Sequence, residues 1–136
     1  MDTKYESAIK AVNNNVGIIY SKLSDFQNLS AIMPPDNVQN WEATTDTCRF
    51  TIPQIGEIGL KIVDRQENSC VKYTADGQTR FNFNIWVQMK EVEPYSSRIK
   101  VTMKADINPM LKMMVGSHLQ KFVDMLATAI STHNYN

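Results

Sequence analysis

Between residues 38 and 107 the chain alternates apolar and polar residues with a period of two, which is typical of half-buried β-strands. Turn-forming residues interrupt the alternation at intervals that suit hairpins. The pattern predicts an antiparallel meander with strands over residues 38–43, 47–52, 57–65, 70–75, 79–92 and 99–107. A shorter alternating segment over residues 4–12 predicts one further strand, which makes seven in all.

The sharpest turn signal is Asp76–Gly77, between the strands over residues 70–75 and 79–92. A type I′ turn needs positive φ at both central residues, and Asp and Gly accept that conformation more readily than most residues. The pair therefore predicts a tight two-residue hairpin at this point.

Two short helices are predicted after the first strand, from the residues that can cap them. Asn15 can cap a helix over residues 16–23. Ser24 or Asp25 can cap a second helix over residues 26–33, which a pair of prolines ends. These helices separate the first strand from the meander.

A long amphipathic helix is predicted after the meander. Asn108 can cap it, and Pro109 suits its first position because the missing N–H costs nothing there. The helix runs for about 24 residues, and at about 100° per residue one stripe carries Leu111, Val115, His118, Phe122, Met125, Leu126 and Ala129. We expect this stripe to face the sheet, since each large apolar side chain left in water would cost about 1.5–3 kcal/mol.

Composition bounds the class of protein. The chain has 136 residues, 14 Lys and Arg against 14 Asp and Glu, and 43% hydrophobic residues, which indicates one globular domain over residues 1–136. Because the formal net charge is zero and no long basic run occurs, nucleic acid is not expected as a partner. No apolar run approaches the roughly 18 residues of a membrane span, and residues 1–6 lack the features of a secretory signal. We therefore expect a cytoplasmic protein that does not insert into membranes.

Metals and cofactors are not expected. Cys48 and Cys70 form no CxxC pair and are interpreted as reduced, buried thiols. With His118 and His133 they supply too few ligands, too far apart in the sequence, for a metal site. The glycines form no phosphate-binding motif, so no nucleotide cofactor is implied.

The order of elements, one strand, two short helices, six strands and a long helix, is an α+β arrangement. In this order, and in the segments FNFNIWVQM (81–89) and VTMKADINPM (101–110), the chain resembles the SRPBCC superfamily, which has the START-like or helix-grip fold. Both segments are similar to those of its small bacterial polyketide cyclase-like proteins. The resemblance implies a curved seven-stranded antiparallel sheet that holds the C-terminal helix in its concave face, with a cavity between them.

Strand alternation and helical phase aim mostly apolar side chains into that space, where Tyr73 adds a hydroxyl. The other candidate cavity-lining residues are Leu60, Ile62, Phe81, Phe83, Ile85, Met103, Met114, His118, Phe122 and Met125. The same residues also describe a filled core, and both interpretations stay open. If the cavity is hollow, the chain is expected to bind a hydrophobic or amphipathic small molecule, lipid-like or polyketide-like, as a carrier or sensor.

His118 is the candidate residue for orienting a ligand or for catalysis. It could orient a ligand or act as a general acid or base, or it could be held as a structural residue by one hydrogen bond. Asp64 and Tyr73 are the inward positions that could assist it. No carboxylate pair or Ser/His/Asp arrangement is visible, so binding is favoured, and an enzyme like the polyketide cyclases and aromatases is the second hypothesis.

Trp86 falls on the outer face of its strand, opposite to Phe83 and Ile85. It could mark a homodimer contact or a surface that binds another protein, as in a third hypothesis of an interaction module. Alternatively it is an isolated surface residue shielded by Lys61 or Lys100. Trp41 is interpreted as an edge or mouth residue.

The chain contains eight methionines, and four of them lie on the last helix. Met110, Met113, Met114 and Met125 either line an adaptable pocket or fill gaps in the core, since Met is flexible and polarisable. Met113 falls on the polar side near the start of the helix, where we expect it to guard a pocket mouth or contact a partner.

Overall fold

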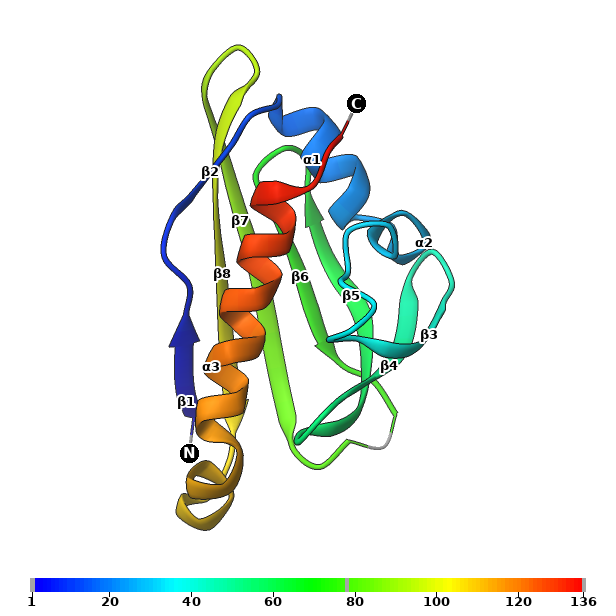
Figure 1. Cartoon of the computed structure of the whole chain (residues 1–136), viewed down its shortest axis with the longest axis vertical. Coiled ribbons are helices and arrows are strands. Elements are labelled where there is room, and N and C mark those ends of the chain that lie inside the picture. Colours follow the sequence, from blue (N-terminus) through cyan, green and yellow to red (C-terminus); the bar gives the residue numbers. More distant parts are fainter. Residues whose placement is uncertain (1, 78, 136) are drawn as a thin grey trace.

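The predicted meander forms one open antiparallel sheet with the long helix across it (Figure 1). In the computed structural model, which describes residues 2–77 and 79–135, eight strands are arranged in the order β1-β8-β7-β6-β5-β4-β3, and β2 also pairs with β8. The strands are β1 (Asp2–Glu6), β2 (Lys10–Val12), β3 (Gln39–Ala43), β4 (Thr47–Ile52), β5 (Gly56–Gln66), β6 (Cys70–Ala75), β7 (Asn82–Glu93) and β8 (Ser96–Asp106). The helices are α1 (Val16–Leu23), α2 (Phe26–Leu29) and α3 (Pro109–Thr132). The α+β helix-grip fold is confirmed, and the sheet is seven strand positions wide.

The first strand is split, which the sequence does not predict. The chain leaves the strand conformation at Ser7, and β1 and β2 pair with different parts of β8. Ser7 Oγ accepts a hydrogen bond from the Val101 N–H (2.9 Å), so a side chain takes over one position of the strand pairing. Because the first strand is divided at Ser7, the sheet contains eight strands but is seven strands wide.

The capping residues of the helices are confirmed. Asn15 Oδ1 accepts a hydrogen bond from the Ile18 N–H (2.9 Å), and Asp25 Oδ1 accepts one from the Gln27 N–H (2.9 Å). Asn108 Oδ1 accepts one from the Leu111 N–H (2.8 Å) at the start of α3. The predicted end of the second helix is wrong, because α2 stops at Leu29 and the chain continues in turns. After Leu29 the backbone hydrogen bonds join residues three apart, as from the Ile32 N–H to the Leu29 carbonyl (2.9 Å), so the chain tightens into turns instead of continuing the α-helix.

The predicted type I′ turn at Asp76–Gly77 is also wrong. β6 ends at Ala75 and β7 begins only at Asn82, so the connection is longer than two residues. Gly77 has a positive φ of 72°, but Asp76 does not. The reason is that Asp76 still belongs to the strand pairing, since its N–H donates to the Gly59 carbonyl (2.9 Å).

Helix α3 packs against β1, β2 and β8 (Figure 1). Its buried stripe is rotated from the predicted one toward Leu119 and Val123, which are fully buried. Gly116, which the sequence places off the stripe, is buried against Tyr5 of β1, and a Cβ there would lie 3.2 Å from the Tyr5 hydroxyl. The absence of a side chain therefore brings α3 toward the β1 edge and leaves His118 and Met125 at the border of the stripe, half-buried.

One hydrophobic core lies between the sheet and the helices. Ile85 and Val87 of β7 and Val101 and Met103 of β8 have no exposed surface. No helix in the described part of the chain has the length and the hydrophobicity that a membrane crossing demands.

Candidate functional site

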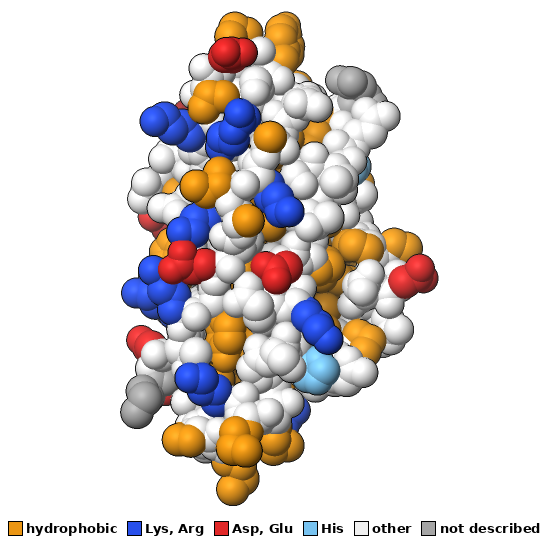
Figure 2. Space-filling view, turned by 60° about the vertical axis from the view of Figure 1, so that its left-hand side comes forward, with side chains coloured by type: hydrophobic (Ala, Val, Ile, Leu, Met, Phe, Trp, Pro, Cys, Tyr) orange, Lys and Arg blue, Asp and Glu red, His pale blue; other side chains and the backbone are white. Residues whose placement is uncertain are grey.

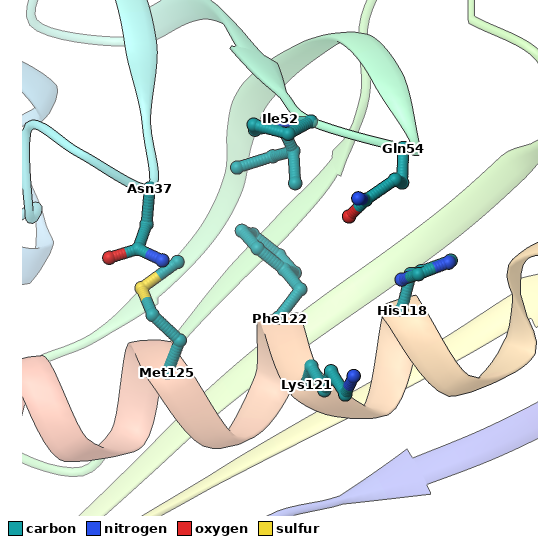
Figure 3. Close-up of a pocket in the computed structure, with 8 residues that line it drawn as sticks. Asn37, Ile52, Gln54, His118, Lys121, Phe122 and Met125 are labelled. Atoms are coloured by element: carbon teal, nitrogen blue, oxygen red, sulfur yellow. The ribbon is translucent and has the colours of Figure 1, made fainter.

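A pocket of about 140 Å³ opens between α3 and the β4–β5 turn (Figure 3). Its lining comes from three parts of the chain: the segment before β3, the turn after β4, and α3. The residues are Asn37, Ile52, Pro53, Gln54, His118, Lys121, Phe122 and Met125. Three of the predicted cavity-lining residues, His118, Phe122 and Met125, therefore share one pocket.

The β4–β5 turn forms the wall opposite α3. The Ile55 N–H donates to the Ile52 carbonyl (3.2 Å), and Gln54 and Gly56 have positive φ values of 70° and 110°. Glycine adopts such values without steric cost, whereas for Gln54 they are unfavourable by about 1–2 kcal/mol. Residues in sparsely populated backbone conformations cluster at binding sites. In Figure 3 the Gln54 side chain extends into the space bounded by Ile52, Phe122 and His118.

The floor of the pocket is apolar and its rim is polar. Phe122 points from α3 toward Ile52, and Met125 points toward Asn37 (Figure 3). The rim offers the imidazole of His118, the ammonium of Lys121 and two side-chain amides. An arrangement of this kind accepts the apolar body of a small molecule and bonds to a carboxylate or carbonyl at its outer end.

A series of aromatic rings continues from the pocket floor into the core. Phe122 stacks on Phe50 with ring centroids 6.2 Å apart, and Phe50 stacks on Trp41 at 5.3 Å. Trp41 meets Phe26 edge-on at 6.5 Å. Within the described residues the buried Trp41 Nε1 has no hydrogen-bond partner, so the indole N–H lies beside these rings without an acceptor. Trp41 thus lies on the edge strand β3, as one of its two interpretations has it, and packs against the core instead of lining the mouth of the pocket.

Tyr73 is occupied by a structural role. Its hydroxyl donates to the Leu23 carbonyl at the end of α1 (2.5 Å), and burial raises the pKa of this phenol far above its usual value. Asp64, the other candidate partner of His118, lies opposite Lys72 in the β5–β6 register and is exposed. The structure therefore brings neither predicted partner to His118 at the pocket.

The remaining predicted cavity residues are mostly packed in the core. Leu60, Phe81, Phe83, Ile85 and Met103 are buried, and Ile62 is partly buried against the same cluster. They contribute to the interior between sheet and helix but do not line the pocket at α3.

The prediction for Met114 is wrong. Its side chain is 58% exposed, and Met110 and Met113 beside it are 73% and 88% exposed. Figure 2 shows hydrophobic side chains gathered at the end of the molecule where α3 begins. The first turns of α3 extend past the sheet, so the stripe that is buried further along is open to solvent here.

The thiols are structural. Burial is the main cause that raises the pKa of Cys48 to about 12, so this residue stays protonated at neutral pH. Cys70 is half-buried, and burial raises its pKa as well. Among the described residues, no three His, Cys, Asp or Glu side chains come together in a way that could hold a metal ion.

Solved structures with the same architecture identify the fold. A START superfamily protein from Mycobacterium smegmatis superposes with a TM-score of 0.67 at 15% identity, covering 96% of this chain and 94% of that one. A truncated norcoclaurine synthase from Thalictrum flavum superposes with a TM-score of 0.75 at 13% identity, covering 98% and 96%. A conserved protein from Geobacillus kaustophilus gives 0.68 at 15% identity, covering 96% and 93%.

The chain therefore has a START-like fold. The sequence matches no family model and no curated protein. At these levels of identity the likeness extends to the fold, and function has to be argued from the site.

Proposed function

We propose that the chain binds a hydrophobic or amphipathic small molecule at the border between α3 and the sheet, as a carrier or sensor. The observation that carries the proposal is the pocket in which Phe122, Ile52 and Met125 form an apolar floor beneath a polar rim. Lys121 and His118 favour a ligand whose outer end is a carboxylate or another acceptor.

The size of the pocket narrows the ligand class. Its volume of about 140 Å³ is close to that of an engineered cavity of about 150 Å³ that takes up benzene, and below the roughly 300–1,000 Å³ of sites for larger molecules. The ligand that fits without rearrangement is a single ring or a short branched chain with one polar end. A longer acyl or polyketide-like chain requires Phe122 or Met125 to move, and the flexible Met125 can do so with little strain.

The expected affinity follows from the same dimensions. Burying about 150 Å² of apolar surface at about 25 cal/mol per Å² contributes about 4 kcal/mol, which corresponds to millimolar binding. A charge-assisted hydrogen bond to Lys121 adds about 1.5–3 kcal/mol. We expect a small aromatic acid to bind with a dissociation constant of about 10 to 100 micromolar.

Filling the pocket tests the proposal. Binding of benzoate, phenylacetate and hexanoate is measured by NMR chemical-shift perturbation and calorimetry for the wild type and for Met125→Trp. The control is Met113→Trp, which adds the same bulk at an 88% exposed position of the same helix. We expect Met125→Trp to weaken binding at least tenfold and Met113→Trp to leave it unchanged. Absence of binding by every acid, or equal loss in both variants, would contradict the proposal.

A second experiment tests the contact between Lys121 and the polar end of the ligand. Lys121→Met retains much of the apolar length of the side chain and removes its charge. We expect this variant to lose affinity for phenylacetate and to retain affinity for the neutral phenylacetamide. If both ligands weaken equally, the ammonium has no role in recognition.

Catalysis is a second candidate, since His118 and Lys121 share the pocket. One structure of similar fold, norcoclaurine synthase from Thalictrum flavum, is described in complex with dopamine and hydroxybenzaldehyde. We would assay this chain for condensation of an arylethylamine with an aromatic aldehyde, comparing wild type with His118→Ala. Turnover that His118→Ala abolishes, while pocket binding persists, would favour an enzyme in which His118 moves protons. Turnover that His118→Ala leaves unchanged would exclude this role for His118.

A further inference from the structure

The outer face of the sheet carries a lattice of positive charge that pocket binding does not use. On this face the register aligns Lys72, Trp86, Thr102 and Glu6 in one row across β6, β7, β8 and β1. Neighbouring rows place further cations around the indole. The cations of this lattice are Lys4, Lys72, Lys90, Arg98, Lys100 and Lys104. Figure 2 shows Lys and Arg side chains along the left-hand side of the molecule.

Trp86 sits at the centre of this lattice. The Lys72 ammonium lies 5.2 Å from the centroid of the indole ring and that of Lys104 lies 5.8 Å away. These are the residues that shield the ring, rather than the predicted Lys61 or Lys100. Such cation–π contacts attract both ammonium groups to the indole ring.

The lattice already holds one carboxylate. Glu6 Oε1 lies 2.8 Å from the Lys4 Nζ, and its Oε2 contacts the Lys100 Nζ. Asp64 faces the lattice from β5, opposite Lys72. The register also places Asp2 of β1 and Asp106 of β8 on this face. Four carboxylates, Asp2, Glu6, Asp64 and Asp106, therefore stand against six cations, which leaves a small excess of positive charge on a chain whose formal net charge is zero.

Beside Trp86 the outer face is hollowed into an open groove of about 640 Å³. Its cations are Lys90, Arg98 and Lys100, and its lining includes no Asp or Glu. The rest of the lining is apolar or neutral: Ile9, Gln66, Ser69, Cys70, Trp86, Gln88 and Met89. Ile9 is 68% exposed, which leaves apolar surface open next to the charges.

We infer that this groove binds an acidic segment of a partner protein, an extended chain whose carboxylates alternate with apolar side chains. The carboxylates would pair with Lys90 and Arg98, since Lys100 is already paired with Glu6, and the apolar side chains would cover Ile9 and Trp86. Charge complementarity of this kind sets orientation and speeds association.

Other occupants of the groove agree less well with its lining. A second copy of this chain, joined by a two-fold axis through the lattice, would set cation against cation. A nucleic-acid backbone would pair with the cations and leave the exposed Ile9 without a matching apolar group. The groove is also separate from the pocket at α3, whose lining shares no residue with it.

The test uses a fluorescein-labelled peptide of about twelve residues that alternates Glu and Leu, with binding followed by anisotropy. The groove variant is Lys90→Glu with Arg98→Glu, and the control is Lys112→Glu, an exposed position on α3. We expect the groove variant to weaken binding about tenfold or more, and Lys112→Glu to leave it unchanged. Raising the salt concentration is also expected to weaken binding.

A second measurement locates the bound peptide. Cys70 lines the groove, so saturating peptide is expected to slow its alkylation, and a peptide in which Gln replaces Glu is expected not to do so. Met125→Trp, which fills the pocket at α3, is expected to leave peptide affinity unchanged. Peptide binding in the groove and ligand binding in the pocket can therefore each be rejected without rejecting the other. Any one of four results would overturn the inference. The first two are equal weakening by Lys112→Glu and a Cys70 that the peptide does not protect. The others are tighter binding of single-stranded DNA or of anionic vesicles, and a dimer in sedimentation that the groove variant dissociates.

Discussion

The two faces of β7 and β8 differ in chemistry although they share a backbone. Ile85 and Met103 on the inner face have no exposed surface, whereas Trp86 and Lys104, one residue further along, lie on the outer face with their side chains in a cation–π contact. The inner positions determine whether the sheet can pack against α3. The outer positions are free of that constraint, so surface chemistry can vary on this sheet without any change in its core.

Truncation at neighbouring positions of β8 gives the sharpest test of this difference. We expect Met103→Ala to lower the free energy of unfolding by about 2–5 kcal/mol, because it leaves a cavity in the packed core. Lys104→Ala should change it by about 0.5 kcal/mol or less. Urea unfolding measures both, and similar losses in the two variants would contradict the assignment of the faces.

Removal of one buried hydroxyl should have the next largest effect. Tyr73→Phe deletes the donor to the Leu23 carbonyl at the end of α1, and an unpaired buried carbonyl costs about 1–3 kcal/mol. The exposed Tyr95→Phe serves as the control and should be neutral. Because Tyr73 does not line the pocket, we expect Tyr73→Phe to bind phenylacetate as the wild type does; a specific loss of binding would indicate that its hydroxyl does contact the ligand.

The reactivities of the two cysteines distinguish the inner and outer faces of the sheet without any mutation. Cys48 is buried with its pKa raised to about 12, whereas Cys70 is half-buried beside the outer groove. We expect iodoacetamide to modify Cys70 well before Cys48 in the native protein, and both at similar rates in urea. Peptide mapping of the alkylated sites distinguishes them, and early labelling of Cys48 would show that the interior opens readily.

The smallest effect is expected at Glu6, on the outer lattice. Hydrogen bonds from Lys100 and Lys4 lower the pKa of its carboxyl from 4.5 to about 2. A carboxyl whose pKa is depressed on folding stabilises the protein above the unfolded pKa, and this contribution is lost as the pH falls through the folded one. The difference in melting temperature between wild type and Glu6→Gln should therefore be constant above about pH 4.5 and shrink toward pH 2. A difference that does not vary with pH would mean that these ion pairs do not contribute.

Local signals account for most of the fold that the sequence predicts. Asn15, Asp25 and Asn108 act as caps through their own side chains and near neighbours, and strand alternation depends only on residues two apart. These predictions needed no knowledge of partners far away in the chain. The error at the Asp76–Gly77 turn occurred where a distant contact decides, since Asp76 pairs with Gly59.

The candidate site was only partly predictable for the same reason. Helical phase placed Phe122 inward, but the rotation of α3 depends on contact between Gly116 and Tyr5, which no local pattern shows. Gln54 reaches the pocket because of its positive φ, and Lys72 reaches Trp86 because of the strand register. The alternation of apolar and polar residues predicts neither the φ of a turn residue nor the register between two strands.

The hydrogen bond between Ser7 and Val101 has a consequence for the order of folding. The two residues are 94 positions apart, and β8 receives both halves of the first strand along one edge. During synthesis the first strand has no partner until β8 has left the ribosome. Topologies dominated by such distant pairings fold slowly, since the entropy of closing a long loop is lost before the contacts form. We therefore expect β1 and β2 to join the sheet after the β5–β8 hairpins, as pulsed hydrogen exchange would reveal.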